Sequence, residues 1–460
     1  MVLFRLAYTF LIYYVRRIVA FILSITSASV SEKIFKTIFF LSISILCSSQ
    51  GDLTRRAYWG VSYEYKENEL VITDVVNEFS FAKAKVIKGD IILSVNNHII
   101  QSKEEFKKLL VGKSEGAELL LKIKRSNKNI QIKVIADPYP YEKKEGVTFE
   151  YGSFTTTSND QLRTIISKPE KSVKKLPAIL FIQWLSCDHV ESQPTFMDGN
   201  VRLIHDLSKA GYLVMRTDKP GVGDSKGKPC DEYGFDYELQ VHKEALQKLK
   251  QRVDVDTNNI FILGSSMGGT MAPMVAQNQP IRGLIVTGCY YKTWYEHMLE
   301  IERRISYLDG DTPFKTYEKM QKWSKFYSLY LNDKMTPGNI INKYPEFKDV
   351  WQDGPEHQYG RNVKYYMEAI DYNVADYWSK INIPVLVIYG AYDYIMSKQD
   401  HEMIADAMNS TKEGLGTFLE IPKMDHGLNI YDSQKAAYTS FSPVYDENLT
   451  LYVLTWLKKF

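Results

Sequence analysis

A Gly-x-Ser-x-Gly turn between a short buried strand and a helix constrains this chain more than any other feature. The strand is predicted over 260–263, the turn is formed by Gly264, Ser266 and Gly268, and an amphipathic helix is predicted over 267–278. A turn of this kind holds the serine in a strained conformation with its hydroxyl above the sheet. The flanking positions require glycine because side chains there would collide with backbone. Ser266 is therefore a candidate nucleophile, whereas the alternative interpretation is an ordinary Gly-rich strand–helix turn.

A candidate acid and a candidate base follow Ser266 in the order that such a nucleophile requires. A serine hydroxyl needs a basic histidine, and the histidine needs a carboxylate that orients it. Asp393 and His426 each stand in a loop directly after a late predicted strand. Asp425 is an alternative acid, but its adjacency to His426 makes a productive hydrogen bond awkward. The sequence thus predicts a Ser266–His426–Asp393 triad, with the N–H of Met267 at the start of the helix as a donor to an oxyanion.

Histidine usage and overall charge indicate no further cofactor or nucleic-acid chemistry. Of the eight histidines, none matches the position of His426 better. We expect His189 and His401 on the surface, and nothing pairs them into a metal site. The sequence implies neither a metal nor an organic cofactor. The net charge of +2 gives no electrostatic case for nucleic-acid binding.

The region 145–460 alternates predicted strands with helical patterns, which favours an α/β fold with a mostly parallel sheet. Between 290 and 382 the alternation stops, and an aromatic-rich helical stretch predicts a cap insertion over the carboxyl ends of the strands. We expect its aromatic side chains to serve mainly in packing. The predicted strands are 146–155, 161–167, 178–183, 212–216, 260–263, 283–287, 385–389 and 416–421.

The residues of this region resemble the α/β-hydrolase family, in particular its serine aminopeptidase-like and monoglyceride-lipase-like members. Segment 218–225 (Asp-Lys-Pro-Gly-Val-Gly-Asp-Ser) is similar to the Asp-x-x-Gly-x-Gly-x-Ser segment of that family. The resemblance implies a second oxyanion donor just after the third strand, where the family commonly has His-Gly-x. Gln183, Trp184 and Leu185 stand there, so the resemblance implies the N–H of Leu185. Because Trp184 replaces glycine, the choice between Leu185 and Trp184 stays open.

A smaller β-rich module precedes this region, at 55–137. Segment 86–96 (Val-Ile-Lys-Gly-Asp-Ile-Ile-Leu-Ser-Val-Asn) resembles the Gly-Asp-x-Ile-x-x-Val/Ile-Asn segment of PDZ domains, and segment 60–63 is similar to a divergent form of their carboxylate-binding loop. The resemblance implies capture of a C-terminal peptide by β-augmentation. The alternative is a structural PDZ-like domain that docks on the catalytic domain of its own chain.

The first fifty residues have a composition of their own, with apolar runs separated by basic residues. None of the runs is long enough for a confident membrane-spanning helix. Segment 31–50 resembles a secretory signal, because two lysines, an apolar stretch and small polar residues follow one another. We therefore expect an exported (periplasmic or extracellular) or membrane-attached protein. Cys187 and Cys230 could pair in an oxidising compartment or remain as two unpaired loop cysteines.

Together these features predict an exported serine hydrolase that cleaves an ester or a peptide bond through an acyl-enzyme. A small-molecule ester or peptide is the expected substrate. The PDZ-like module favours a peptidase slightly, since it could present a chain terminus. Two alternatives stay open: a carboxylesterase or lipase-like acyl hydrolase, and an inactive hydrolase fold that acts as a peptide-binding scaffold.

Overall fold

The computed structural model describes residues 53–171, 175–194, 197–442 and 444–460. The predicted signal or anchoring segment, 1–50, lies outside these ranges. Residues 53–460 form one unit by their internal contacts. Within the described ranges, no helix combines the length and the hydropathy that crossing a membrane requires.

The N-terminal module is an antiparallel sheet in the order β2-β3-β4-β6-β7, with β5 paired to β4. Its core contains the buried apolar residues of alternating strand positions together with Phe106 and Leu110 of the longer helix. The elements are β1 (Ala57–Tyr58), β2 (Val61–Lys66), β3 (Glu69–Val75), α3 (Ser80–Lys83), β4 (Ile91–Val95), β5 (His98–Ile99), α4 (Lys103–Leu110), β6 (Glu118–Arg125), β7 (Lys128–Ile135) and β8 (Asp137–Pro138). The short strands β1 and β8 pair with each other, and β2 stands at one edge of the larger sheet.

The second sheet has eight strands in the order β18-β17-β14-β13-β11-β12-β10-β9. The six strands from β18 to β12 are parallel, and the β9–β10 hairpin runs antiparallel at the other side. The strands are β9 (Val147–Thr155), β10 (Gln161–Pro169), β11 (Leu176–Ile182), β12 (Leu213–Thr217), β13 (Val255–Ser265), β14 (Gly283–Thr287), β17 (Val385–Gly390) and β18 (Gly416–Ile421). The predicted α/β class with a mostly parallel sheet and a preceding β-rich module is confirmed.

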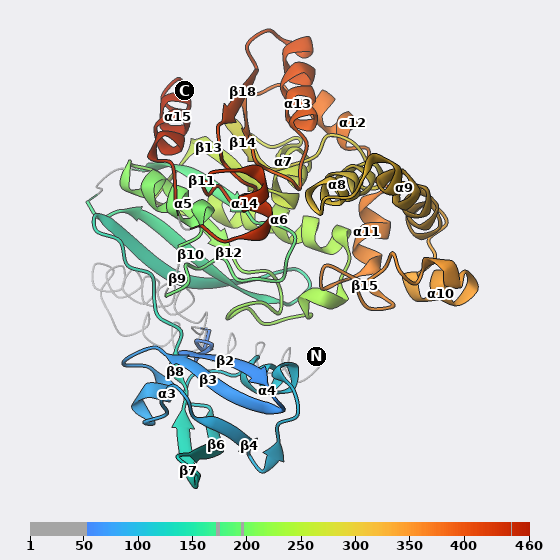
Figure 1. The fold of residues 1–460 in the computed structure, drawn as a ribbon. Coiled ribbons are helices and arrows are strands. Elements are labelled where there is room, and N and C mark those ends of the chain that lie inside the picture. The colour runs from blue at the N-terminus through green and yellow to red at the C-terminus, as the bar shows by residue number, and fades with distance from the viewer. Residues whose placement is uncertain (1–52, 172–174, 195–196, 443) are drawn as a thin grey trace, which may run out of the picture. The chain divides into compact units, whose positions relative to one another are not determined.

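Helices cover both faces of the large sheet, which explains the continuous apolar runs of its central strands. The helices are α5 (Gly199–Lys209), α6 (Phe235–Lys250), α7 (Met267–Ala276), α13 (Lys398–Thr411), α14 (Gln434–Thr439) and α15 (Glu447–Leu457). One core cluster joins the sheet to α6, α7 and α13, and the other joins it to α5 and α15. Figure 1 shows α5 and α15 together on one face, with α7 and α13 on the other. The central strand β13 is thus buried on both faces where it reaches the turn at Ser266.

The segment between β14 and β17 is a helical insertion, seen in Figure 1 as α8 to α12 beside the sheet. It contains α8 (Trp294–Leu308), α9 (Pro313–Tyr327), a π-helical turn (Ser328–Asn332), α10 (Pro337–Lys343), the β15 (His357–Gln358) and β16 (Arg361–Asn362) hairpin, α11 (Val363–Ala369) and α12 (Val374–Ser379). Many of its aromatic residues, among them Trp294, Tyr330 and Trp378, are buried in the same core cluster as α6 and α7, whereas Tyr307, Phe314, Tyr317 and Tyr359 are exposed. The buried ones serve in packing, as the sequence predicts.

Candidate active site

The turn at Ser266 has the strained geometry that the sequence predicts. β13 ends at Ser265 and α7 begins at Met267, so that Ser266 joins them with φ 57° and ψ −124°. A Cβ at Gly264 would lie 2.4 Å from the carbonyl oxygen of Gly268, and a Cβ at Gly268 would lie 2.1 Å from that of Ile182. Both positions therefore exclude any side chain, and the packing around them enforces the serine conformation.

Three side chains from separate loops form one hydrogen-bonded chain. Ser266 Oγ lies 3.0 Å from His426 Nε2, and His426 Nδ1 lies 2.8 Å from Asp393 Oδ2. Asp393 follows β17 and His426 follows β18, so both lie, like Ser266, at the carboxyl ends of parallel strands. Gly288 makes room for the imidazole, since a Cβ there would lie 2.8 Å from His426 Cε1. The structure thus brings together all three predicted triad residues.

The surroundings of Asp393 favour the ionised form of its carboxylate. It is 2% exposed, and its Oδ1 accepts hydrogen bonds from the backbone N–H groups of Ile395 (2.8 Å) and Met396 (2.9 Å). Burial opposes its charge, but His426 and these N–H groups outweigh that effect and hold the pKa of Asp393 below its usual value. For His426, burial acts against the charged form, yet the neighbouring Asp393 raises the pKa above the ordinary value. The pair is therefore suited to stabilise an imidazolium.

Asp425, the alternative acid, is engaged elsewhere. Its Oδ1 accepts a hydrogen bond from the backbone N–H of Asn429 at 2.7 Å. Burial raises the pKa of Asp425, whereas the pKa of Asp393 is lowered. The imidazole of His426 is thus oriented by Asp393 and not by its neighbour in the sequence.

The loop after β11, which contains Leu185, is held by a buried lysine. Lys219 Nζ donates hydrogen bonds to the carbonyl oxygens of Trp184 (2.6 Å), Leu185 (3.0 Å) and Ser186 (3.1 Å). In a trans peptide the C=O and the following N–H point in opposite directions. A fixed Trp184 carbonyl therefore also fixes the direction of the Leu185 N–H, which stays the predicted oxyanion donor beside the N–H of Met267.

Lys219 belongs to a buried charge cluster that reaches into the helical insertion. Glu238 on α6 lies 3.3 Å from Lys219 and 2.7 Å from Arg361 on β16. Arg361 Nη1 also donates to the Leu185 carbonyl at 3.0 Å. Burial lowers the pKa of Lys219 to about 8 against the attraction of Glu238, and both cations hold the pKa of Glu238 well below its usual range. No sequence pattern marks this cluster, although Lys219 lies within segment 218–225.

A pocket of about 310 Å³ opens at the triad. Three carboxylates line it, Asp188, Glu191 and Asp198, together with Ser266 and His426. The further lining residues are Trp184, His189, Gln193, Asn200, Val201, Ser265 and Gly427. The described lining therefore comes from the loop after β11, the start of α5 and the triad itself.

Cys187 and Cys230 form a disulfide with their Cα atoms 5.8 Å apart. The bond ties the pocket loop to the 3₁₀ turn at Cys230–Glu232. Of the two interpretations that the sequence left open, the paired one is correct.

The expectation that His401 is a surface residue is wrong. Its side chain is fully buried, Nδ1 lies 2.7 Å from the Ser397 carbonyl oxygen, and Nε2 accepts from the Cys289 N–H at 3.3 Å. His189 is partly exposed and packs edge-on against Tyr139 at 5.0 Å. Polar neighbours in the sequence concealed that α13 turns His401 toward the sheet.

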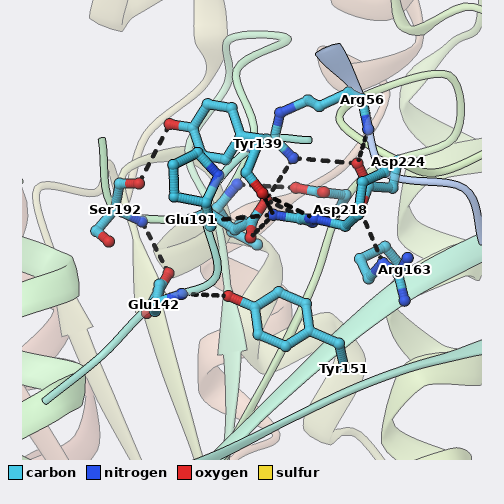
Figure 2. A network of polar contacts seen from close by, with 12 residues as sticks. Arg56, Tyr139, Glu142, Tyr151, Arg163, Glu191, Ser192, Asp218 and Asp224 are labelled. Atoms are coloured by element: carbon cyan, nitrogen blue, oxygen red, sulfur yellow. Dashed lines mark hydrogen bonds and ion pairs between the residues drawn. The ribbon is translucent and has the colours of Figure 1, made fainter. Parts of the chain in front are cut away.

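A second polar network fixes the pocket loop from the N-terminal side (Figure 2). Arg55 pairs with Glu191 at 2.8 Å and also with Asp224, and Arg56 pairs with the same two carboxylates. Arg163 reaches Asp224 at 3.1 Å. The segment before β1 is thus bound to the pocket loop and to segment 218–225. No local sequence pattern signals this network, because its partners lie between 61 and 169 positions apart.

A second cluster in Figure 2 lies around Glu142, which follows β8. Its carboxylate accepts two hydrogen bonds of 2.8 Å from Arg216 and one of 2.8 Å from the Ser192 N–H. The hydroxyl oxygen of Tyr151 accepts a hydrogen bond of 3.0 Å from the Glu142 N–H. The connection between the two sheets is therefore fixed to both β12 and the pocket loop.

Two family models match the chain. The model described as serine aminopeptidase, S33, matches residues 199–429, which is half of the chain and includes all three triad residues. The model for the PDZ domain matches residues 57–135. Both resemblances predicted from the sequence are thus confirmed at the level of the family.

Among curated proteins, Esterase EstD from Thermotoga maritima is similar, with 24% identity over 204 residues. The match covers 44% of this chain and 42% of that protein, so the chain spans about two fifths of the length of this relative.

Similar solved structures have low sequence identity. Est1E from Butyrivibrio proteoclasticus with bound ferulic acid is 17% identical, with a TM-score of 0.43 over 67% of this chain and 98% of that chain. DcsB in complex with its substrate analogue is 15% identical, with a TM-score of 0.44 over 68% and 99%. The hydrolase GrgF from Penicillium sp. sh18 is 16% identical, with a TM-score of 0.42 over 68% and 98%.

Proposed function

Because the chain belongs to the serine aminopeptidase S33 family, we propose that it hydrolyses carboxylic esters through an acyl-enzyme on Ser266. One observation carries the proposal: Ser266 Oγ, the His426 ring and the Asp393 carboxylate form a continuous chain of 3.0 and 2.8 Å contacts at a pocket. A nucleophile, a base and an orienting acid in this arrangement are what acyl transfer requires.

The proposed reaction has two halves. Ser266 Oγ attacks the ester carbon while His426 Nε2 takes the hydroxyl proton, and Asp393 stabilises the resulting imidazolium. The backbone N–H groups of Met267 and Leu185 hold the oxyanion. His426 then protonates the departing alcohol. In the second half, water attacks the acyl-enzyme with His426 again as the base, and Ser266 is released with the carboxylic acid.

The proposal of ester substrates is supported by the similarity to Esterase EstD. A second candidate, cleavage of peptide bonds beside a free amino group, is favoured by the three carboxylates in the pocket. Glu191 is already paired with Arg55 and Arg56, and Asp198 caps α5 by accepting from the Asn200 N–H. Asp188 is exposed and therefore best placed to receive a substrate ammonium group.

We also propose that the PDZ-like module binds a C-terminal peptide along β2. The free edge of β2 supports this, since an edge strand offers unpaired backbone groups to an extended chain. Export is proposed on the signal-like pattern of segment 31–50. The disulfide between Cys187 and Cys230 supports an oxidising compartment.

The test is a substrate panel of p-nitrophenyl acyl esters and aminoacyl p-nitroanilides with the full chain and its Ser266→Ala variant. We expect ester turnover that falls by about 10³-fold or more in the variant. Asp188→Asn separates the two candidates, because it should reduce anilide cleavage and spare neutral esters. Equal turnover by both forms would refute Ser266 as the nucleophile, and no turnover by the folded chain would leave a peptide-binding scaffold as the better interpretation.

A further inference from the structure

The segment before β1, residues 53–56, is buried against the hydrolase fold although it precedes the N-terminal module in the sequence. Leu53 is buried, and its carbonyl oxygen accepts a hydrogen bond of 2.6 Å from Arg163 Nη2. Arg55 is 2% exposed, and its carbonyl oxygen accepts a hydrogen bond of 2.9 Å from the Glu115 N–H. Both residues are therefore fixed in place, and the side chain of Arg55 reaches the pocket loop after β11.

All three nitrogen atoms of the Arg55 guanidinium donate hydrogen bonds. Nε and Nη2 bind the carbonyl oxygen of Tyr139 at 3.1 and 2.9 Å. Nη2 and Nη1 bind the two carboxylate oxygens of Glu191 at 2.8 and 3.2 Å, and Nη1 also binds Asp224. A guanidinium that meets a carboxylate at two points fixes the geometry of the pair. Arg55 thus holds the carboxylate of Glu191 in one orientation.

Glu191 connects this network to the catalytic pocket. Its side chain lines the pocket with Ser266 and His426, whereas the described lining does not include Arg55. Glu191 is 3% exposed, so solvent ions screen its charge little. A weakly screened charge acts on a charged ligand across roughly 10 Å. The net charge of Glu191 and its partners therefore affects which substrates the pocket accepts.

The other two carboxylates of the pocket differ from Glu191. Asp188 is exposed, so solvent screens its charge. Asp198 caps α5 and accepts a hydrogen bond of 2.8 Å from the Asn200 N–H, so the N-terminus of the helix partly compensates it. Glu191 alone among the three is compensated by buried side chains.

The charges of the buried network balance. Figure 2 shows the three carboxylates beside Arg56 and Arg163. Arg56 pairs with Glu191 and Asp224, and Arg163 lies 3.1 Å from Asp224. Burial raises the pKa of Asp218 to about 7 against the attraction of Arg56, so its charge is complete only well above pH 7. There, three positive charges face three negative ones, on Arg55, Arg56, Arg163, Glu191, Asp218 and Asp224.

We propose that Arg55 determines the charge specificity of the catalytic pocket through Glu191: it compensates this carboxylate and so lowers the preference of the pocket for cationic substrates in favour of neutral esters. This inference deepens the proposed function and rests on it. Arg55 is a positioning residue, since it does not line the pocket but fixes and neutralises a residue that does. Without its charge the network is left with one negative charge in excess, and a cationic substrate gains from it.

The test compares two pairs of esters, in each of which the members have the same shape and one carries a permanent positive charge. On the acyl side the pair is the p-nitrophenyl esters of 4-trimethylammoniobutyrate and 5,5-dimethylhexanoate. On the alcohol side it is acetylcholine and 3,3-dimethylbutyl acetate. The measured quantity is the ratio of kcat/KM for the charged member to kcat/KM for the neutral member. The full chain is assayed at low ionic strength and about pH 8.5, where Asp218 is ionised and the trimethylammonium group cannot titrate.

We expect Arg55→Gln to raise this ratio by about 10-fold in at least one pair, because one buried unit charge loses its partner roughly 10 Å or less from the substrate. Glu191→Gln should lower the ratio, and the double variant should return it to about the wild-type value. Arg55→Lys keeps the charge and should keep the ratio, even where it loses stability. Arg125→Gln is the matched control: it changes the total charge equally, but Arg125 pairs with Asp90 and is absent from the described lining of the pocket.

Thermal unfolding is recorded for every variant, because Arg55→Gln breaks buried ion pairs. If that variant does not fold, Glu191→Gln and the double variant decide, and a ratio that Glu191→Gln does not lower overturns the proposal. An unchanged ratio in both pairs for folded Arg55→Gln would also overturn it, as would an equal rise in Arg55→Lys, since Arg55 would then support the fold alone. Absence of turnover by the wild-type chain would instead refute the proposed function. Calorimetric binding of the four esters to Ser266→Ala, with and without Arg55→Gln, then tests the charge preference independently of catalysis.

Discussion

Replacing Lys219 by Met removes the buried ammonium that holds the Leu185 loop. The substitution keeps the length and apolar stem of the side chain but deletes three hydrogen bonds, to the carbonyls of Trp184, Leu185 and Ser186. It also removes one of the two cations that face Glu238, which is 0% exposed.

The structure gives the expected size of the loss in unfolding free energy and of the loss in kcat. Breaking a buried ion pair by removing one partner costs about 3–5 kcal/mol. Arg361 stays 2.7 Å from Glu238, so we expect the lower end, about 3 kcal/mol of unfolding free energy. Losing one oxyanion donor costs about 10²–10³ in kcat. The Leu185 N–H is misdirected in this variant but not deleted, and we therefore expect kcat to fall by about 10²-fold with little change in KM.

The assay is steady-state hydrolysis of a p-nitrophenyl ester, with urea unfolding measured on the same samples. Lys243→Met is the matched control, because Lys243 lies on the exposed face of the helix that carries Glu238. A loss of stability with unchanged kcat would show that Lys219 supports the fold alone. Unchanged stability and unchanged kcat would refute the reasoning about the buried cluster as a whole.

Three further predictions follow from the same geometry. Asp393→Asn should keep the fold and lower kcat by about 10⁴-fold in the ester assay, because the imidazole loses its orienting charge; a loss below 10-fold would contradict this role. Asp393 raises the pKa of His426, and the neutral imidazole is the base. We therefore expect kcat/KM to rise with pH through a midpoint above 6.5, and we expect Asp393→Asn to lower that midpoint. A midpoint at or below 6.5 would count against the pairing. Reducing the disulfide, which links residues 43 positions apart, should lower the unfolding free energy by about 4 kcal/mol, measured in urea with and without reductant; an unchanged midpoint would show that the bond contributes nothing.

Local chemistry explains which parts of the site could be predicted from the sequence. The turn at Ser266 requires glycine at two fixed positions, and the triad residues each follow an apolar strand, so both features leave a mark in neighbouring residues. β13 was predicted from 260–263 alone, but it begins at Val255. Val255 is buried, but residues 256–259 are polar and lie opposite a register shift in the pairing with β11, which resumes at Ile260, so they show no pattern of alternating burial.

Long-range polar contacts explain what could not be predicted. Arg55 and Glu191 are 136 positions apart, and Arg361 meets Glu238 only because the insertion folds back onto α6. Nothing in the sequence around any of these four residues indicates its partner. The burial of His401 could not be predicted either, since it depends on how α13 packs and not on the polar neighbours of His401 in the sequence.

The central claim is that Ser266 is the nucleophile, and covalent labelling tests it most directly. The full chain is treated with a fluorophosphonate, digested, and mapped by mass spectrometry beside Ser266→Ala and His426→Ala. The account predicts one adduct, on Ser266, formed in step with the loss of ester turnover and strongly slowed in His426→Ala. An adduct on another residue that abolishes turnover, or undiminished turnover by Ser266→Ala, would contradict it.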